Sequence, residues 1–553
     1  MYDMVAGIAA KYPNEPAYEF YGVKTSYAAF LRRIRAAAAA FAYRGIGKGD
    51  VVTICMPNVP QAVDCFYGLD CIGAVANMVH PLSAQKEISF YLNISGSKYI
   101  LTLDMFYGKV VAALEEVDHP VTVLAARIQD ELPFPLKTAY YLKKGREFRH
   151  VPDREHGVLW TEFLKKRVPD ERLVPARFDR DRTSVILYSG GTSGVPKGIC
   201  LSDLNMNALA MQCRNAVLYP FEPGITLLAC MPMFHGFGLG VNLHTILIHG
   251  ACSILMPTFT IESYAKALAK KKPSFIAGVP TIFEALLHMP QLDGVDLGFL
   301  KGMFCGGDSL TPELKKKVDA FLEAHGAMIH VQEGYGLTEC VTASCLTPMD
   351  RYKEHSIGLP FADTLYAIVE PGTDDVLPPG KEGEIILSGP TVMLHYLKNE
   401  EETAKTLRRL PDGRIWLYTG DLGSMDEEGW VYFRQRIKRM IVTNGYNVYP
   451  GQLENVIDGC PEVAYSCVIG VKEQRRGQRV RAYVVLRDGY VGDDAMREKI
   501  LAVLRHHIAG YAIPREIIFR DALPKTLVGK VAFRLLEEEA NEEAMRQTAE
   551  GEQ

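Results

Sequence analysis

Short runs of apolar, β-branched residues alternate with longer helical patterns along most of this chain. Runs of the first kind include DVVTICMPN, SKYILTL, TSVILYSG, ITLLACMP, ACSILMP and SFIAGVP; runs of the second include SYAAFLRRIRAAAAAFAY and TPELKKKVDAFLEAHG. Strands that are apolar on both faces are typical of parallel sheets covered by crossover helices. The alternation therefore predicts an α/β protein with substantial parallel sheet.

The length of 553 residues exceeds what one compact core organises, so at least two domains are expected. Near Gly372, the run PGTDDVLPPGKEGEIILSG predicts a β-rich subregion joined by Pro/Gly turns. A compact α+β tail with strand-like AYSCVIGVKE and RVRAYVVLRD ends the chain. We expect a large N-terminal domain over residues 1–435, a hinge over 436–440 and a small C-terminal domain over 441–553.

Charge and cysteine usage exclude several classes of function. The formal charge of −5 provides no basic surface for nucleic acid. The 12 cysteines form no C-x-x-C pair, which favours free thiols in a reducing cytosol. No basic segment followed by an apolar one opens the chain, so no signal peptide is predicted. A cytoplasmic protein with at most peripheral membrane contact is expected.

One long stretch without Asp, Glu, Lys or Arg lies between Glu222 and Glu262. A membrane span needs about 20 predominantly apolar residues. Here prolines, glycines and histidines interrupt the run, among them Pro232, His235 and Gly250. Buried strands and a helix beside a cleft are the better interpretation.

The run YSGGTSGVPKG, from Tyr188 to Gly198, follows a strand-like segment and has the composition of a phosphate-binding loop. Glycines let backbone N–H groups approach a polyphosphate, hydroxyls add donors, and a lysine adds positive charge. The run lacks the Gly-Lys-Ser/Thr of the common P-loop. Taken alone, it would also fit a Gly/Ser surface loop.

This run resembles the signature loop of the adenylate-forming superfamily, which includes acyl-CoA synthetases, coumarate-CoA ligases and luciferase. Six further motifs appear in the order typical of that family: MPMFHGFGLG, GGDSLTPEL, GYGLTE, YTGD, RQRIKRMI and LPKTLVGK. The resemblance covers nearly the whole chain. It implies a large AMP-binding domain of packed α/β subdomains and a small mobile lid domain.

The resemblance also implies an enzyme that uses ATP, Mg²⁺ and coenzyme A. Thr338 would contact phosphate or substrate carboxylate, Glu339 would hold Mg²⁺, and His235 would lie beside the acyl carboxylate. Asp421 would bind the ribose with Arg436 as its partner. The remaining nucleotide or thiol contacts would come from Ser189, Gly190, Gly191, Thr192, Ser193, Gly194, Lys197, Gly306, Gly307, Gly334, Tyr335, Gly336 and Gly445.

Lys530, the last residue of LPKTLVGK, is the residue that we expect to drive adenylation. A surface lysine is normally only a solvated charge. In the family, this lysine reaches the active site while the carboxylate attacks the α-phosphate. A cation between two anions offsets their repulsion. The small domain would then rotate, so that Lys530 leaves and the Gly445 region enters for thiol transfer.

Some positions depart from the family pattern. Arg439 occupies the hinge position that is usually Asp or Lys, and Gln435 replaces the usual Gly or Asp. Val442 and Asn444 stand where several relatives carry lysine. The insert over residues 133–148 is similar to one in long-chain fatty acyl-CoA synthetases and suggests a hydrophobic acid of medium or long chain. Aromatic and steroid acids stay open.

Three alternatives remain. An acyl-AMP ligase would load a separate carrier protein instead of coenzyme A. A luciferase-like oxygenase is disfavoured, since dark ligases dominate the family. A catalytically inactive nucleotide-binding protein would show decay at Lys530, Glu339 or Asp421, and none is seen. The substrate is expected to be a small carboxylic acid, and the oligomeric state is left open.

Overall fold

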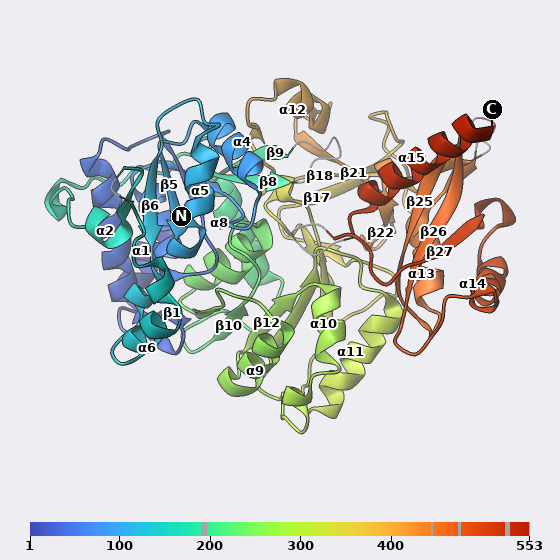
Figure 1. The fold of residues 1–553 in the computed structure, drawn as a ribbon, viewed down its shortest axis with the longest axis horizontal. Coiled ribbons are helices and arrows are strands. Elements are labelled where there is room, and N and C mark those ends of the chain that lie inside the picture. Colours follow the sequence, from blue (N-terminus) through green and yellow to red (C-terminus); the bar gives the residue numbers. More distant parts are fainter. Residues whose placement is uncertain (154, 190–195, 444–445, 474–476, 526–530, 552–553) are drawn as a thin grey trace. The chain divides into compact units, whose positions relative to one another are not determined.

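The fold is seen in a computed structural model that describes residues 1–153, 155–189, 196–443, 446–473, 477–525 and 531–551 (Figure 1). The chain separates into two compact units. One comprises Met1–Tyr366 and Leu387–Tyr418, and the other comprises Ala367–Ile386 and Thr419–Gln553. Among the described residues, no helix has the length and apolar character needed to cross a membrane.

Two large sheets with covering helices build the first unit. In the described residues, the first sheet has nine strands in the order β16 (Leu359–Pro360), β15 (Cys345–Leu346), β14 (Val331–Tyr335), β13 (Gly302–Gly306), β12 (Phe275–Gly278), β10 (Thr226–Ala229), β11 (Cys252–Leu255), β1 (Pro16–Phe20) and β2 (Val23–Ser26). Its centre, from β14 to β1, is parallel. The prediction of a parallel α/β sheet is confirmed.

The second sheet of this unit has eight strands within the described part. Their order is β19 (His395–Tyr396), β9 (Lys197–Ser202), β8 (Thr183–Ser189), β4 (Val75–Met78), β3 (Val51–Cys55), β5 (Tyr99–Leu103), β6 (Thr122–Ala126) and β7 (Gly157–Leu159). Strands β4 to β7 pair in parallel, whereas β8 and β9 form an antiparallel hairpin. This hairpin is the scaffold of the predicted phosphate loop.

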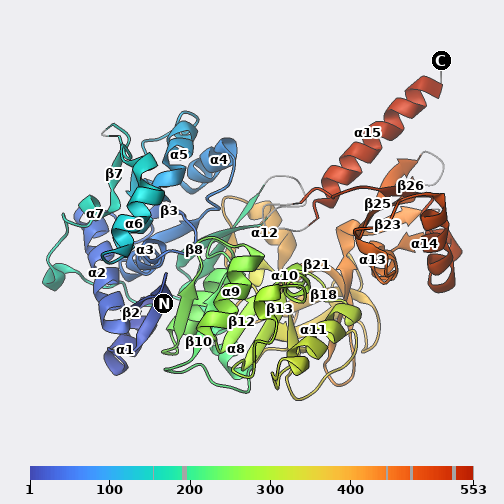
Figure 2. The same ribbon diagram turned by 60° about the horizontal axis from the view of Figure 1, so that its bottom comes forward.

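Helices cover both sheets of the first unit (Figures 1 and 2). The poly-alanine helix predicted near residues 26–44 is α2, and Ser26 caps it by accepting from the backbone N–H of Ala29. The helices are α1 (Tyr2–Lys11), α2 (Tyr27–Tyr43), α3 (Pro60–Cys71), α4 (Gln85–Ser95), α5 (Tyr107–Leu114), α6 (Leu136–Lys143), α7 (Trp160–Phe163), α8 (Asp203–Asn215), α9 (Ile261–Lys271), α10 (Pro280–Leu286), α11 (Pro312–Ala324) and α12 (Glu400–Thr406).

The charge-free stretch contains β10, β11 and, between them, a buried π-helix, η5 (Phe237–Thr245). Strands and a helix were predicted here, but the π winding was not. The Thr245 hydroxyl donates to the Gly240 carbonyl at 2.8 Å, five residues earlier. Segments of π-helix are rare in proteins, and those that occur often lie at functional sites.

A third sheet contains β17 (Leu365–Val369), β18 (Gly383–Ser388), β21 (Ile415–Met425) and β20 (Leu407–Arg409), with β22 (Val431–Arg436) beside β21. It corresponds to the β-rich subregion expected near Gly372. The division between the two units falls inside three of these strands.

The second unit ends in a sheet with helices on both faces. Its strands are β24 (Tyr446–Val448), β23 (Ile441–Thr443), β26 (Gly477–Leu486) and β25 (Val463–Glu473), with β27 (Glu516–Phe519) beside β26. Alternate residues of β25 and β26 belong to different cores, as the period of a strand requires. Helices α13 (Pro450–Asp458) and α14 (Asp494–His507) pack on one face, and α15 (Phe533–Gly551) packs on the other (Figure 1).

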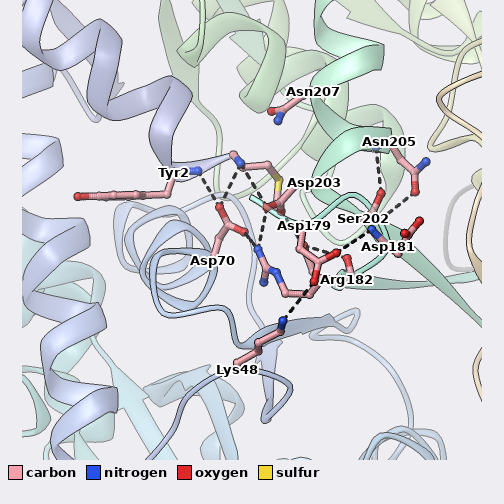
Figure 3. Close-up of polar contacts among 12 residues, drawn as sticks. Tyr2, Lys48, Asp70, Asp179, Asp181, Arg182, Ser202, Asp203, Asn205 and Asn207 are labelled. Atoms are coloured by element: carbon pink, nitrogen blue, oxygen red, sulfur yellow. Dashed lines mark hydrogen bonds and ion pairs between the residues drawn. The ribbon is translucent and has the colours of Figure 1, made fainter. Parts of the chain in front are cut away.

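A buried ion cluster anchors the base of the β8–β9 hairpin (Figure 3). The Arg182 Nη2 atom lies 3.0 Å from Asp70 Oδ1 and 2.7 Å from Asp203 Oδ2. Ser184 donates to Asp203 Oδ1 at 2.6 Å. Burial raises the pKa of Asp203 to about 6, helped by the charge of Asp70. Removing one member would leave a buried charge uncompensated. The intact cluster therefore holds together the two chain segments at the base of the hairpin.

Candidate active site

The predicted phosphate loop joins the two strands of the β8–β9 hairpin. Ser189 and Lys197 are paired across the hairpin and mark the ends of the described strands. Gly190, Gly191, Thr192, Ser193 and Gly194 lie outside the described residues. The predicted contacts of these five residues therefore stay predictions.

Lys197 does not face open solvent. Its Nζ contacts the Glu402 carboxylate and lies 5.0 Å from the ring centroid of Tyr396. Lys197 begins β9, Tyr396 ends β19, and Glu402 belongs to α12. The lysine of the phosphate hairpin is thus held by a segment about 200 residues later in the chain.

Tyr396 extends this contact to the predicted magnesium ligand. Its hydroxyl donates to Glu339 Oε1 at 2.8 Å, and the backbone N–H of Met393 donates to the Glu339 carbonyl at 2.8 Å. Burial, followed by the charge of Glu339, raises the pKa of Tyr396 far above its ordinary value, so the phenol stays protonated and donates. Sequence reasoning missed Tyr396 and Glu402, because no motif marks HYLKNEEET.

The described residues contain no cluster of three or more His, Cys, Asp and Glu that would hold a metal alone. Mg²⁺ is usually bound by one or two carboxylates together with substrate phosphates. Glu339, linked through Tyr396 to Lys197 of the phosphate hairpin, fits that pattern. The donor set therefore suits a metal that arrives with its nucleotide.

Two predicted glycine segments meet at the carboxyl ends of β13 and β14. Gly306 pairs with Gly334, and a Cβ on Gly306 would lie 3.1 Å from the Gly334 carbonyl oxygen. A Cβ on Gly336 would lie 2.0 Å from the Thr342 carbonyl oxygen. Gly307 has φ +83°, a backbone conformation that residues with a side chain rarely adopt. Ligands of open α/β sheets bind at this kind of edge, where Tyr335 also ends β14.

Glu333 is a further site residue that sequence reasoning missed. It directly precedes Gly334 on β14, and its Oε1 accepts from the backbone N–H of Leu310 at 3.1 Å. Burial raises its pKa to about 7. The contact ties the loop after Gly307 to the strand that carries Tyr335. An acidic residue directly before the GYGLTE motif was the available signal.

A strained turn follows Glu339. Val341 has φ +68° and ψ −59°, and the Thr342 backbone N–H donates to the Cys340 carbonyl at 2.9 Å, which defines a γ-turn centred on Val341. Val341 is fully buried. Positive φ in a β-branched residue is a genuine outlier, and such strain concentrates at functional sites.

The γ-turn packs against the segment that carries His235. A Cβ on Gly236 would lie 1.7 Å from the Val341 carbonyl oxygen, and a Cβ on Gly240 would lie 3.3 Å from Val341 Cγ1. The two glycines are four residues apart and therefore share one side of the segment. His235 Nδ1 accepts from the Phe237 backbone N–H at 3.3 Å. The segment that carries His235 thus packs against the turn that follows Thr338 and Glu339.

The predicted ribose pair lies in the second unit. Asp421 of β21 and Arg436 of β22 are directly opposite in the strand register, and Arg436 Nε lies 2.9 Å from Asp421 Oδ1. The Asp421 side chain is 1% exposed, whereas that of Arg436 is 48% exposed. The structure brings these two residues together, and their role in binding the ribose stays a prediction.

The hinge-position residue Arg439 is held within the second unit. Its guanidinium forms an ion pair with Glu454 of α13 at 2.5 Å and lies 4.9 Å from the ring centroid of Phe533. Phe533 begins α15, three residues after Lys530. Lys530 and Gly445 lie outside the described residues, so their roles stay predictions.

Comparisons with known proteins agree with this arrangement. Residues 6–397 match the family described as AMP-binding enzyme, and residues 452–530 match the AMP-binding enzyme C-terminal domain. The chain belongs to the AMP-binding enzyme family. The predicted resemblance to the adenylate-forming superfamily, close to fatty acyl-CoA synthetases, is confirmed, as is the prediction of an AMP-forming acyl-CoA synthetase.

Individual relatives are similar over nearly their whole length. A long-chain-fatty-acid–CoA ligase of Bacillus subtilis is 34% identical over 97% of this chain and 93% of its own. A ligase of the same name from Escherichia coli is 32% identical over 97% and 94%. Among solved structures, ATP-bound MatB from Rhodopseudomonas palustris has a TM-score of 0.83 at 26% identity, covering 98% and 99%. The Mycobacterium tuberculosis fatty acyl CoA synthetase has 0.70 at 25%, covering 98% of each chain.

Proposed function

We propose that this chain activates a hydrophobic carboxylic acid of medium or long chain with ATP and transfers the acyl group to coenzyme A. The observation that carries the proposal is the contact series from Lys197 through Tyr396 to Glu339, which joins the phosphate hairpin to the predicted metal ligand. The relatives named as long-chain-fatty-acid–CoA ligases support the choice of acid.

In the first half-reaction, the acid carboxylate attacks the α-phosphate and pyrophosphate leaves. Both reactants are anions, so the residues around them must supply positive charge. Lys197, which is paired with Glu402, would turn its charge to the phosphates at the hairpin, and Lys530 would bring a second cation. Glu339 would hold Mg²⁺, which when bound neutralises phosphate charge. His235 and Thr338 would orient the carboxylate.

The nucleotide would be bound by its base and its sugar. Tyr335 would offer an aromatic face to the base at the carboxyl end of β14, beside the paired glycines Gly306 and Gly334. Asp421 would accept hydrogen bonds from the ribose diol, with Arg436 fixing the carboxylate.

The second half-reaction needs a path for the pantetheine thiol to the acyl-adenylate. A rotation of the C-terminal domain about the 436–440 segment would withdraw Lys530 and bring in the Gly445 region. Arg439 would move with the C-terminal domain, because Glu454 and Phe533 hold its side chain. The thiol sulfur then attacks the acyl carbon, and AMP leaves with the electron pair of the broken anhydride bond.

Pyrophosphate release with a panel of carboxylic acids, ATP and Mg²⁺, with and without coenzyme A, tests the proposal. Fatty acids are expected to support release, and coenzyme A is expected to increase turnover by removing the adenylate. Release that does not depend on any acid would contradict acid activation. Transfer to a phosphopantetheinylated carrier protein, but not to coenzyme A, would replace the acceptor.

Two matched lysine variants connect the assay to the site. Lys197→Met removes the cation of the phosphate hairpin and should lower kcat/KM for ATP by about tenfold to a hundredfold. Lys98→Met removes a surface lysine that directly precedes β5 of the same sheet and pairs with Asp50 at 2.6 Å, and it should leave kcat/KM unchanged. Equal effects of the two changes would remove the support that Lys197 gives to the proposal.

A further inference from the structure

An exposed segment of the first unit combines outward apolar side chains with positive charge. Residues 133–150 contain five Lys or Arg and one Glu. The side chains of Phe134, Leu136 and Leu142 are 84%, 47% and 65% exposed. Large apolar side chains at such exposure in one short segment indicate an interaction surface. We call residues 133–150 the α6 surface.

The helix at its centre is oriented with apolar residues facing outward. Tyr140 of α6 packs against the main core of the unit. Leu136, Ala139 and Leu142 follow one another at intervals of three, which places them in one row of the helix, and all three are exposed. A helix that only covered a core would show the opposite arrangement.

The charges of the α6 surface are available to an outside partner. Lys143, Lys144, Arg146 and Arg149 are exposed, and none of them forms an ion pair with another residue in the described ranges. Lys137 pairs with Asp130 at 3.5 Å. The basic groups therefore surround the apolar row at the carboxyl end of the helix without neutralisation by nearby acids.

We propose that the α6 surface docks on a lipid bilayer that contains anionic headgroups. Apolar side chains bordered by Lys and Arg match the boundary between acyl chains and anionic headgroups, where each half of the pattern finds its partner. A folded protein partner would offer a groove for the apolar row, but a bilayer satisfies both features over a broad area. The chain as a whole carries −5, so the positive charge is local to this surface.

The benefit of membrane docking to the enzyme rests on the proposed function. Medium- and long-chain acids partition into bilayers because each buried methylene gains about 0.8 kcal/mol. An enzyme that docks on the bilayer would meet its substrate where that substrate accumulates. The docking itself requires no turnover, so it is measured separately.

Vesicle flotation of the full-length protein tests the proposal. Binding is expected to vesicles of phosphatidylcholine with phosphatidylglycerol, to fall with added salt, and to be at least about tenfold weaker with phosphatidylcholine alone. The double variants Phe134→Ser/Leu142→Ser and Lys143→Glu/Lys144→Glu should each lower the partition coefficient by about tenfold or more. Wild-type flotation that is absent or independent of lipid charge would overturn the proposal.

Matched controls use exposed residues elsewhere in the same unit. Met328 is 92% exposed, and Lys316 and Lys317 lie on the exposed side of α11. Met328→Ser and Lys316→Glu/Lys317→Glu should leave flotation unchanged, and loss equal to that of the α6 variants would overturn the assignment to this surface. Pyrophosphate release with a water-soluble acid and no vesicles reports on the proposed function independently. All α6 variants should retain that activity, since they touch no site residue.

Discussion

The two units present their predicted site residues in different ways. In the first unit, Lys197, Tyr396 and Glu339 come from distant segments and are joined by side-chain contacts. In the second unit, Asp421 and Arg436 lie opposite each other in adjacent strands. One arrangement depends on long-range packing, and the other depends on local register. Substitutions in the first unit should therefore disturb the arrangement of several predicted active-site residues, whereas substitutions in the second unit should each remove a single contact.

The largest expected effect tests whether the second unit also supplies chemistry. Lys530→Ala should reduce acyl-AMP formation by about a hundredfold to a thousandfold, because the attacking and attacked groups would lose a shared cation. Single-turnover pyrophosphate release measures this step. Thioester formation from supplied acyl-AMP should be spared. Equal loss of both steps would contradict the role of Lys530 in adenylation.

The next effect concerns the register pair. Asp421→Ala removes the predicted ribose acceptors and should weaken ATP binding by roughly 1.5–3 kcal/mol, measured by calorimetry. Asp426→Ala is the control at the end of β21, since Asp426 accepts from Tyr432 at 3.0 Å and from the backbone N–H of Trp430 in the turn before β22. That variant should lower thermal stability without changing ATP affinity. An unchanged ATP affinity in Asp421→Ala would exclude the ribose role.

A smaller effect is expected from removing the contact between Tyr396 and Glu339 in the first unit. Tyr396→Phe removes the hydroxyl that donates to Glu339 Oε1 and should lower kcat/KM for MgATP by about tenfold, corresponding to about 1.4 kcal/mol. The effect should shrink at high Mg²⁺ if the hydroxyl orients the metal ligand. Tyr264→Phe, which removes a buried hydroxyl beside the Ala277 carbonyl, serves as the control. Similar kinetics in both variants would separate Tyr396 from the site.

The smallest effect tests the strained turn. Val341→Gly relieves the positive φ but loses the side chain that packs toward Gly240, so stability should change by no more than about 1 kcal/mol. The kcat for adenylation should nevertheless fall a few-fold, because Thr338 and Glu339 lose their fixed approach to His235. Lys272→Gly relaxes a positive φ of +49° at the end of α9 and should leave kcat unchanged. Parallel behaviour of the two variants would show that the turn is only structural.

Much of the fold could be predicted because each strand is a short apolar run and each helix has its own signals. The α2 helix is an example, since Ser26 and its alanines define its start and its body. The π winding of η5 was not predictable, because the glycines of this helix pack closely on atoms outside it, Gly238 on Pro232 and Gly240 on Leu209.

The site residues likewise fall into those that the sequence could indicate and those that it could not. Asp421 and Arg436 were proposed as a pair from the family resemblance, and they lie opposite each other in adjacent strands. Tyr396, Glu402 and Glu333 carry no local signal strong enough to separate them from ordinary surface or strand residues. Their contacts exist only once β19 and α12 have packed beside β9 and once the Gly307 loop has closed on β14.

The contact between Gly236 and the Val341 carbonyl has a consequence for engineering the acid specificity of this enzyme. A library that varies the His235 segment alone will lose most members with any side chain at position 236, since even a methyl group overlaps the opposing backbone. Libraries that vary residues 340–342 together with 236–240 would allow the backbone at 340–342 to move away when a side chain is added in the 236–240 segment. Selectivity for the acid and efficiency with the nucleotide should then evolve as a coupled pair of traits.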